Sequence, residues 1–72
     1  MGDPHRETFG TMLQRLRAAV GLSQEALAER AGLSARGISD LERGRRREPH
    51  PETVHKLAEA LGLDAAARAA FS

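Results

Sequence analysis

Apolar residues recur at helical spacing in short segments, and a glycine follows most of these segments. The first stripe is Phe9, Leu13, Leu16 and Val20, before Gly21. The most regular stripe, at positions i, i+3, i+4 and i+7, is Val54, Leu57, Ala58 and Leu61, before Gly62. This spacing places the apolar side chains on one face of a helix, and glycine readily adopts the left-handed backbone that ends one. The pattern predicts a bundle of short helices.

Capping residues mark where these helices begin. Ser23 and Ser34 stand where N-caps of a second and a third helix are expected, and Pro51 suits the first position of a fourth. Asp64 caps a short alanine-rich fifth helix, and the first opens at Glu7 or Thr8. The third helix is expected to run to about Arg43. We therefore predict an all-α domain of five helices over residues 8–72, preceded by a flexible arm at residues 1–7.

Length and composition exclude several classes of protein. The chain has 72 residues, enough for one domain, and no cysteine, which removes disulfides, thiolate zinc sites and cysteine nucleophiles. No apolar stretch approaches the roughly 20 residues that span a bilayer. The first residues of the chain lack the basic segment followed by an apolar segment that is typical of a signal peptide. A cytoplasmic protein is expected.

The positive charge is concentrated in the middle of the chain. The formal net charge is only +1, but residues 34–50 hold five arginines against three acidic residues. Four of these arginines fall within residues 43–47. Arginine suits bidentate contacts with phosphate and guanine, so the cluster is a candidate for binding nucleic acid. The alternative interpretation is that these arginines form an ordinary solvated loop.

Residues 24–43 carry the pattern of two helices joined by a tight turn. A steep crossing needs a small residue on the first helix, which Ala28 provides, and a turn residue that tolerates a left-handed backbone, which Gly32 provides. The apolar residues spaced to share a core with the rest of the domain are Leu27, Ala31, Leu33, Ile38 and Leu41.

Three runs within this region resemble a known family. They are Gly21-Leu22-Ser23-Gln24-Glu25-Ala26-Leu27-Ala28, Ala31-Gly32-Leu33-Ser34 and Ile38-Ser39-Asp40-Leu41-Glu42-Arg43-Gly44. They are similar to the Cro/phage-repressor type of helix-turn-helix domain, also called the xenobiotic-response-element family, over roughly residues 8–71. The resemblance implies a compact five-helix, lambda-repressor-like bundle that binds double-stranded DNA in a bacterial transcriptional regulator acting at the nucleoid. Residues 43–50 and the closing residues 61–71 resemble actinobacterial members of the family, in which such a domain often lies at the N-terminus of a longer regulator.

The resemblance implies that the third helix lies in the major groove. Its candidate base-reading residues are Ala35, Arg36, Ser39 and Asp40. Arg36 is the best candidate, by a bidentate contact with guanine, and Ala35 suits a thymine methyl group. Ser39 suits a base or a phosphate. Asp40 either accepts a hydrogen bond from cytosine N4 or pairs with Arg36 one turn earlier, and the pairing is the preferred interpretation.

The family pattern also assigns contacts to the DNA backbone and one structural ion pair. The candidate phosphate-contacting residues are Ser23, Gln24, Ser34, Arg43, Arg45, Arg46 and Arg47. Arg17 and Glu42 match positions that commonly form a partly buried ion pair between the first and third helices. Such a pair would fix the orientation of the helix that reads DNA.

Two departures from the family pattern stand out. Many members carry Gln or Asn where Ala35 and Asp40 stand, so an obvious adenine reader is missing. Gly37 lies inside the third helix, where glycine costs about 1 kcal/mol relative to alanine. It either permits a close approach to the second helix or to the DNA backbone, or is a tolerated surface glycine.

No pattern indicates catalysis, a cofactor or a metal site. His5, His50 and His55 lack ligand spacing on one face and are expected at the surface. The rival function is a protein-interaction adaptor or antitoxin-type module, which predicts an exposed apolar patch. Family members usually act as dimers on two half-sites, although no dimer interface is evident in these residues. The alanine-rich end or Phe71 is the candidate contact with a second subunit or an absent C-terminal domain.

Overall fold

The computed structural model describes residues 8–45 and 49–71, and these residues form five α-helices. The helices are α1 (Phe9–Ala19), α2 (Gln24–Ala31), α3 (Ala35–Glu42), α4 (Pro51–Leu61) and α5 (Ala65–Phe71). The number and order of helices predicted from the sequence are confirmed. No helix within the described residues is long and apolar enough to cross a membrane.

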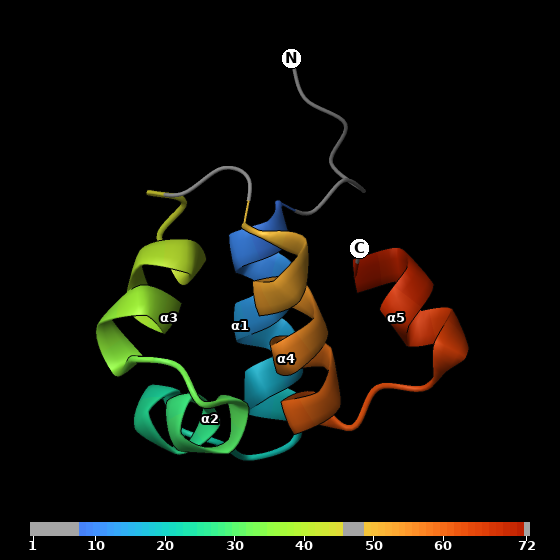
Figure 1. The fold of residues 1–72 in the computed structure, drawn as a ribbon, viewed down its shortest axis with the longest axis horizontal. Coiled ribbons are helices and arrows are strands. Elements are labelled where there is room, and N and C mark those ends of the chain that lie inside the picture. Colours follow the sequence, from blue (N-terminus) through green and yellow to red (C-terminus); the bar gives the residue numbers. More distant parts are fainter. Residues whose placement is uncertain (1–7, 46–48, 72) are drawn as a thin grey trace.

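The helices are arranged around α1 and α4, which lie in the middle of Figure 1. In that view α3 lies on one side, α5 lies on the opposite side, and α2 crosses beneath them. Helix α3 packs against both α1 and α2, α2 packs against α4, and α5 packs against α4. One side of α3 is therefore held by the bundle, and its other side faces outward.

Side-chain caps fix the helix starts where the sequence predicts them. The hydroxyl oxygens of Thr8, Ser23 and Ser34 accept hydrogen bonds from the backbone N–H groups of Thr11, Ala26 and Gly37, at 3.0 to 3.1 Å. The carboxylate of Asp64 accepts from the N–H of Ala67 at 2.8 Å. Of the two residues proposed to open the first helix, Thr8 is therefore the cap. Each bond satisfies a backbone donor that has no partner within its helix.

The core takes its largest fully buried side chains from the first four helices, one from each. These are Leu13, Leu27, Ile38 and Leu57, all 0% exposed. Ala28, Ala31 and Leu41, which the sequence assigned to the core, are also buried, while Leu33 packs partly buried against them. Burial of such aliphatic side chains is the main favourable contribution to folding.

Phe71 belongs to this core, so its proposed role as a contact for a second subunit is wrong. The side chain is only 3% exposed, and its ring lies 4.8 Å from that of Phe9, tilted by 35°. Tilted aromatic pairs at this separation are favourable. The contact between these two rings therefore packs the end of α5 against the start of α1.

Gly10 permits a close crossing that the apolar pattern did not reveal. A Cβ atom built on Gly10 would collide with the carbonyl oxygen of Leu41 and lie 2.7 Å from that of Glu42. Helix α1 therefore crosses the last turn of α3 with almost no space between the two backbones. Only glycine fits here, because the obstructing atoms are backbone and cannot swing aside.

Gly37 does not make the close approach to the second helix that was one interpretation of it. A Cβ atom at this position would meet only the hydroxyl oxygen of Ser34, at 3.0 Å. That oxygen is the cap of the same helix. The protein atoms that limit the size of the side chain at position 37 therefore belong to the start of the same helix.

Replacing Gly10 with alanine is expected to destabilise the fold by about 1–3 kcal/mol, the usual cost of overpacking a filled site. The backbone of α1 must move away from α3 to admit the methyl group. Urea unfolding followed by circular dichroism measures the change. Gly37→Ala is the matched control and should alter stability by no more than about 1 kcal/mol, because helix propensity offsets its one tight contact. Equal effects of the two substitutions would contradict the assigned crossing.

Candidate nucleic-acid interface

A tight turn joins α2 to α3 and sets the angle between them. Gly32 adopts a left-handed backbone with φ of 69°, and the next N–H, of Leu33, donates to the carbonyl of Ala28 at 2.9 Å. Ser34 then caps α3 directly. With only three residues between the helices, the turn leaves little freedom in their relative orientation.

Glu42 ties the end of α3 to α1 and α2. The Nε and Nη2 atoms of Arg17 donate to its two carboxylate oxygens, at 2.7 and 3.0 Å. The side-chain amide of Gln24 donates to the same carboxylate at 3.0 Å. The side chains of Glu42 and Arg17 are 4% and 16% exposed. The ion pair that the family resemblance implied is therefore present, in the bidentate geometry that arginine and carboxylate favour.

The charge on Glu42 is maintained by its partners. Burial alone would raise the pKa of this carboxyl group, but the hydrogen bonds from Arg17 and Gln24 and the positive charge of Arg17 outweigh that effect. The pKa of Glu42 is thus lowered, and the hydrogen bond to Glu42 raises the pKa of Arg17. Both groups are ionised near neutral pH, so α3 carries no uncompensated buried charge.

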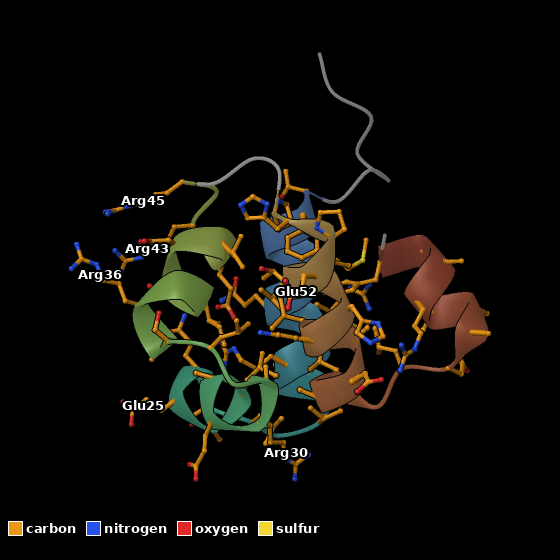
Figure 2. All side chains as sticks on the ribbon, in the orientation of Figure 1. Glu25, Arg30, Arg36, Arg43, Arg45 and Glu52 are labelled. Carbon is orange, nitrogen blue, oxygen red and sulfur yellow. The ribbon has the colours of Figure 1, made fainter. Side chains whose placement is uncertain are left out.

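Three arginines project outward from α3 and the turn after it. Figure 2 shows Arg36, Arg43 and Arg45 on the outer side of α3, pointing away from the other helices. All three are exposed, whereas Ile38 and Leu41 on the inner side are buried. The spacing placed Arg36 on the exposed face of this helix and Ile38 on the opposite, buried face, and the structure has the same arrangement. An exposed, basic helix face is one requirement for contact with DNA.

Asp40 pairs with Arg45, so the preferred interpretation that it pairs with Arg36 is wrong. Its carboxylate lies 3.8 Å from the guanidinium of Arg45, and its backbone carbonyl accepts from the N–H of Arg45 at 2.9 Å. The chain turns at Gly44 and brings Arg45 back over the last turn of α3. Helical spacing alone could not find this partner, because Arg45 lies beyond the end of the helix.

The other candidate DNA-contacting residues lie at the starts of α2 and α3 or along α3. Ser23 and Ser34 are exposed caps, and Gln24, Ala35 and Ser39 are half-buried. A hydroxyl that accepts a capping bond still has its own hydrogen to donate. Arg46 and Arg47 lie outside the described residues.

Two features of this site escaped the sequence analysis. The Nη1 atom of Arg17 donates to the backbone carbonyl of Leu22 at 2.8 Å, so the arginine also fixes the link between α1 and α2. Gln24, expected to meet a phosphate, donates one amide hydrogen to Glu42 instead. A glutamine amide has two donor hydrogens, so a second remains for another acceptor. Sequence spacing carries no signal for these contacts, which join residues on different elements.

Of the three histidines, His50 precedes α4 and His55 lies on it, and His5 is outside the described part of the chain. Within residues 8–45 and 49–71, no group of three or more His, Cys, Asp or Glu side chains could hold a metal ion. His55 is exposed and lies 3.4 Å from Glu59, one turn along α4.

Comparison with known proteins identifies similar domains. A sequence model described as a helix-turn-helix domain matches residues 8–71. The chain is similar to the HTH-type transcriptional repressor RghR of Bacillus subtilis, with 49% identity over 57 residues, which are 79% of this chain and 42% of RghR. The chain thus corresponds to less than half of that relative.

Two solved structures share its fold. The restriction-modification controller protein C.AhdI from Aeromonas hydrophila is 42% identical, with a TM-score of 0.75 over 79% of this chain and 85% of that one. The clp gene regulator ClgR from C. glutamicum is 33% identical, with a TM-score of 0.78 over 97% of this chain and 90% of that one.

Replacing Glu42 with glutamine is expected to destabilise the fold by about 3 kcal/mol at neutral pH, because it leaves Arg17 without its charged partner. Urea unfolding at pH 7 measures this cost. Glu59→Gln removes an equal charge from the surface of α4 and should cost less than about 0.5 kcal/mol. A similar small effect at Glu42 would show that the ion pair contributes little.

The stabilising effect of Glu42 should also depend on pH. Its pKa is lower in the folded state than in the unfolded chain. Its contribution is therefore complete above the unfolded value of about 4.3 and is lost as the pH falls through the folded value. The difference in unfolding free energy between the unaltered chain and Glu42→Gln should shrink between pH 5 and the acid limit of folding. A difference that stays constant over this interval would contradict the assignment.

Proposed function

Because the chain belongs to the helix-turn-helix family of the Cro and phage-repressor type, we propose that α3 enters the major groove of double-stranded DNA. DNA binding in the regulation of transcription is the function of this family. The proposal for this chain concerns which surface meets the duplex and what each side chain does there.

The observation that carries the proposal is the outward, basic face of α3. Arg36, Arg43 and Arg45 are exposed on it, and the acidic Glu42 is turned inward and matched by Arg17. An α-helix fits the width of the major groove, and arginine can contact both guanine and phosphate. The face therefore combines the shape and the charge that a duplex requires.

The residues divide into base readers and backbone contacts. We assign Arg36 to guanine O6 and N7, Ala35 to a thymine methyl group, and Ser39 to a base or a nearby phosphate. The hydroxyls of Ser23 and Ser34 and the free amide hydrogen of Gln24 stand at the starts of α2 and α3, where helix N-termini favour phosphate. The arginines assigned to the DNA backbone are Arg43, Arg45, Arg46 and Arg47.

The rival function, a protein-interaction adaptor or antitoxin-type module, finds less support. It requires an exposed apolar patch. In the part of the chain that the structure describes, Val20 at 49% is the exposed large hydrophobic residue, and a single side chain is not a patch.

The domain is further proposed to act within a cytoplasmic bacterial regulator, as a homodimer on two half-sites one helical turn of DNA apart. We propose that a domain outside residues 1–72 contributes to the dimer contacts. RghR, in which the matching region is less than half of the protein, gives a precedent for additional sequence.

Selection of bound duplexes from a random pool at moderate salt tests the proposal. A reader of DNA should enrich a defined motif, and a dimer should enrich two copies of it with two-fold symmetry. Failure to enrich any sequence, together with no binding of duplex DNA at low salt, would exclude DNA reading by this chain and favour the adaptor.

The two classes of arginine should respond differently to replacement by alanine. Arg36→Ala should remove the preference at one base pair, worth about 1–3 kcal/mol, and leave the other positions unchanged. Arg43→Ala should weaken binding to all duplexes alike and reduce the slope of log affinity against log salt by about 0.9. Fluorescence anisotropy on single-base variants of the selected duplex measures both effects.

The matched control is Arg30→Ala, which removes the same charge from the end of α2, away from the outer face of α3 (Figure 2). Its base preferences should equal those of the unaltered chain, and its salt slope should change less than that of Arg43→Ala. If Arg36→Ala and Arg43→Ala had the same effect on every duplex, the division of roles would be wrong.

A further inference from the structure

Asp40 is the acidic side chain on the outer part of α3. The other carboxylate of this helix, Glu42, is buried and compensated by Arg17. A carboxylate on a surface that approaches phosphates weakens binding to any DNA, because like charges repel. A compensating interaction is therefore needed wherever this domain binds tightly.

The contacts of Asp40 with Arg45 supply an exchangeable partner. The ion pair is long, at 3.8 Å, and the side chains of Arg45 and Asp40 are 63% and 29% exposed. Pairs this exposed are weak and are readily replaced. The backbone hydrogen bond from Arg45 to Asp40, at 2.9 Å, keeps the base of the arginine at this end of α3 when its guanidinium moves.

We propose that Asp40 is a specificity-determining residue that exchanges Arg45 for an amino group on a base. Where cytosine presents its N4 amino group, the carboxylate accepts a hydrogen bond from it, and Arg45 is released to contact a phosphate. Where no amino group faces Asp40, Arg45 stays with the carboxylate and its phosphate contact is lost. A complex with the wrong base pair therefore lacks two interactions, the hydrogen bond to Asp40 and the phosphate contact of Arg45. This inference rests on the proposed DNA-binding function.

The exchange predicts opposite effects of Asp40→Ala on two duplexes. On the selected duplex, affinity should fall, because the contact with the amino group is lost. On a duplex changed at that base pair, affinity should rise, because Arg45 becomes free. The preference of about 5-fold or more at this position should disappear. Glu59→Ala, which removes an equal charge from α4, should leave the preference unchanged.

The salt dependence reports on Arg45 directly. On the changed duplex, Asp40→Ala should steepen the slope of log affinity against log salt by about 0.9, the value for one added phosphate contact. The same substitution made together with Arg45→Ala should leave the slope equal to that of Arg45→Ala alone. Thermal melting of each variant confirms that it is folded.

The possible results separate the two hypotheses. If Asp40→Ala strengthens binding to both duplexes by the same factor, or steepens the slope equally without Arg45, Asp40 is a simple charge and the exchange is overturned. Absence of duplex binding by the unaltered chain would instead overturn the proposed function, and this inference with it. Loss of one base preference with an Arg45-dependent slope supports the exchange.

Discussion

The buried carboxylate of Glu42 is the interaction on which the candidate interface depends. It receives two hydrogen bonds from Arg17 and one from Gln24, and so joins α1, the start of α2 and the end of α3. Arg17 also holds the carbonyl of Leu22, between α1 and α2. Because a charged carboxylate that accepts several hydrogen bonds tolerates little displacement, these contacts fix the direction in which α3 presents its outer face.

The crossing at Gly10 supports the same arrangement from the side of α1. Its missing side chain lets α1 approach the carbonyls of Leu41 and Glu42, on the turn of α3 that carries the buried carboxylate. The short approach brings Arg17, two turns further along α1, within reach of Glu42. Close packing and ion pairing thus act on the same end of α3. The other end is set separately, by the turn at Gly32 and the cap at Ser34.

Local rules predicted the helices because each helix end depends on residues next to it in the sequence. Ser23, Ser34 and Asp64 cap their own helices, and the apolar spacing placed Leu27, Ile38 and Leu57 inside. Errors arose where a partner lies on another element. Asp40 meets Arg45 beyond the end of the helix, and Phe71 meets Phe9 from the other end of the chain. Family resemblance supplied the Arg17–Glu42 pair, which spacing alone does not reveal. The roles of Arg36 and the other candidate DNA contacts remain predictions.

The chain has a formal net charge of only +1, so its suitability for DNA depends on where charges lie rather than on their sum. Acidic side chains form ion pairs with nearby basic side chains: Glu42 with Arg17, and Glu52 with Lys56 along α4. Arg36 and Arg43 have no acidic partner within 4 Å among the described residues and stand on the outer side of α3 (Figure 2). Asp40 is the exception on that face, and its weak pair with Arg45 reduces the positive charge of the free protein there. On the proposed function, we expect this arrangement to attract a duplex to the outer face of α3 with modest strength. Such moderation favours discrimination between sequences, because binding to phosphates alone is then insufficient for a tight complex.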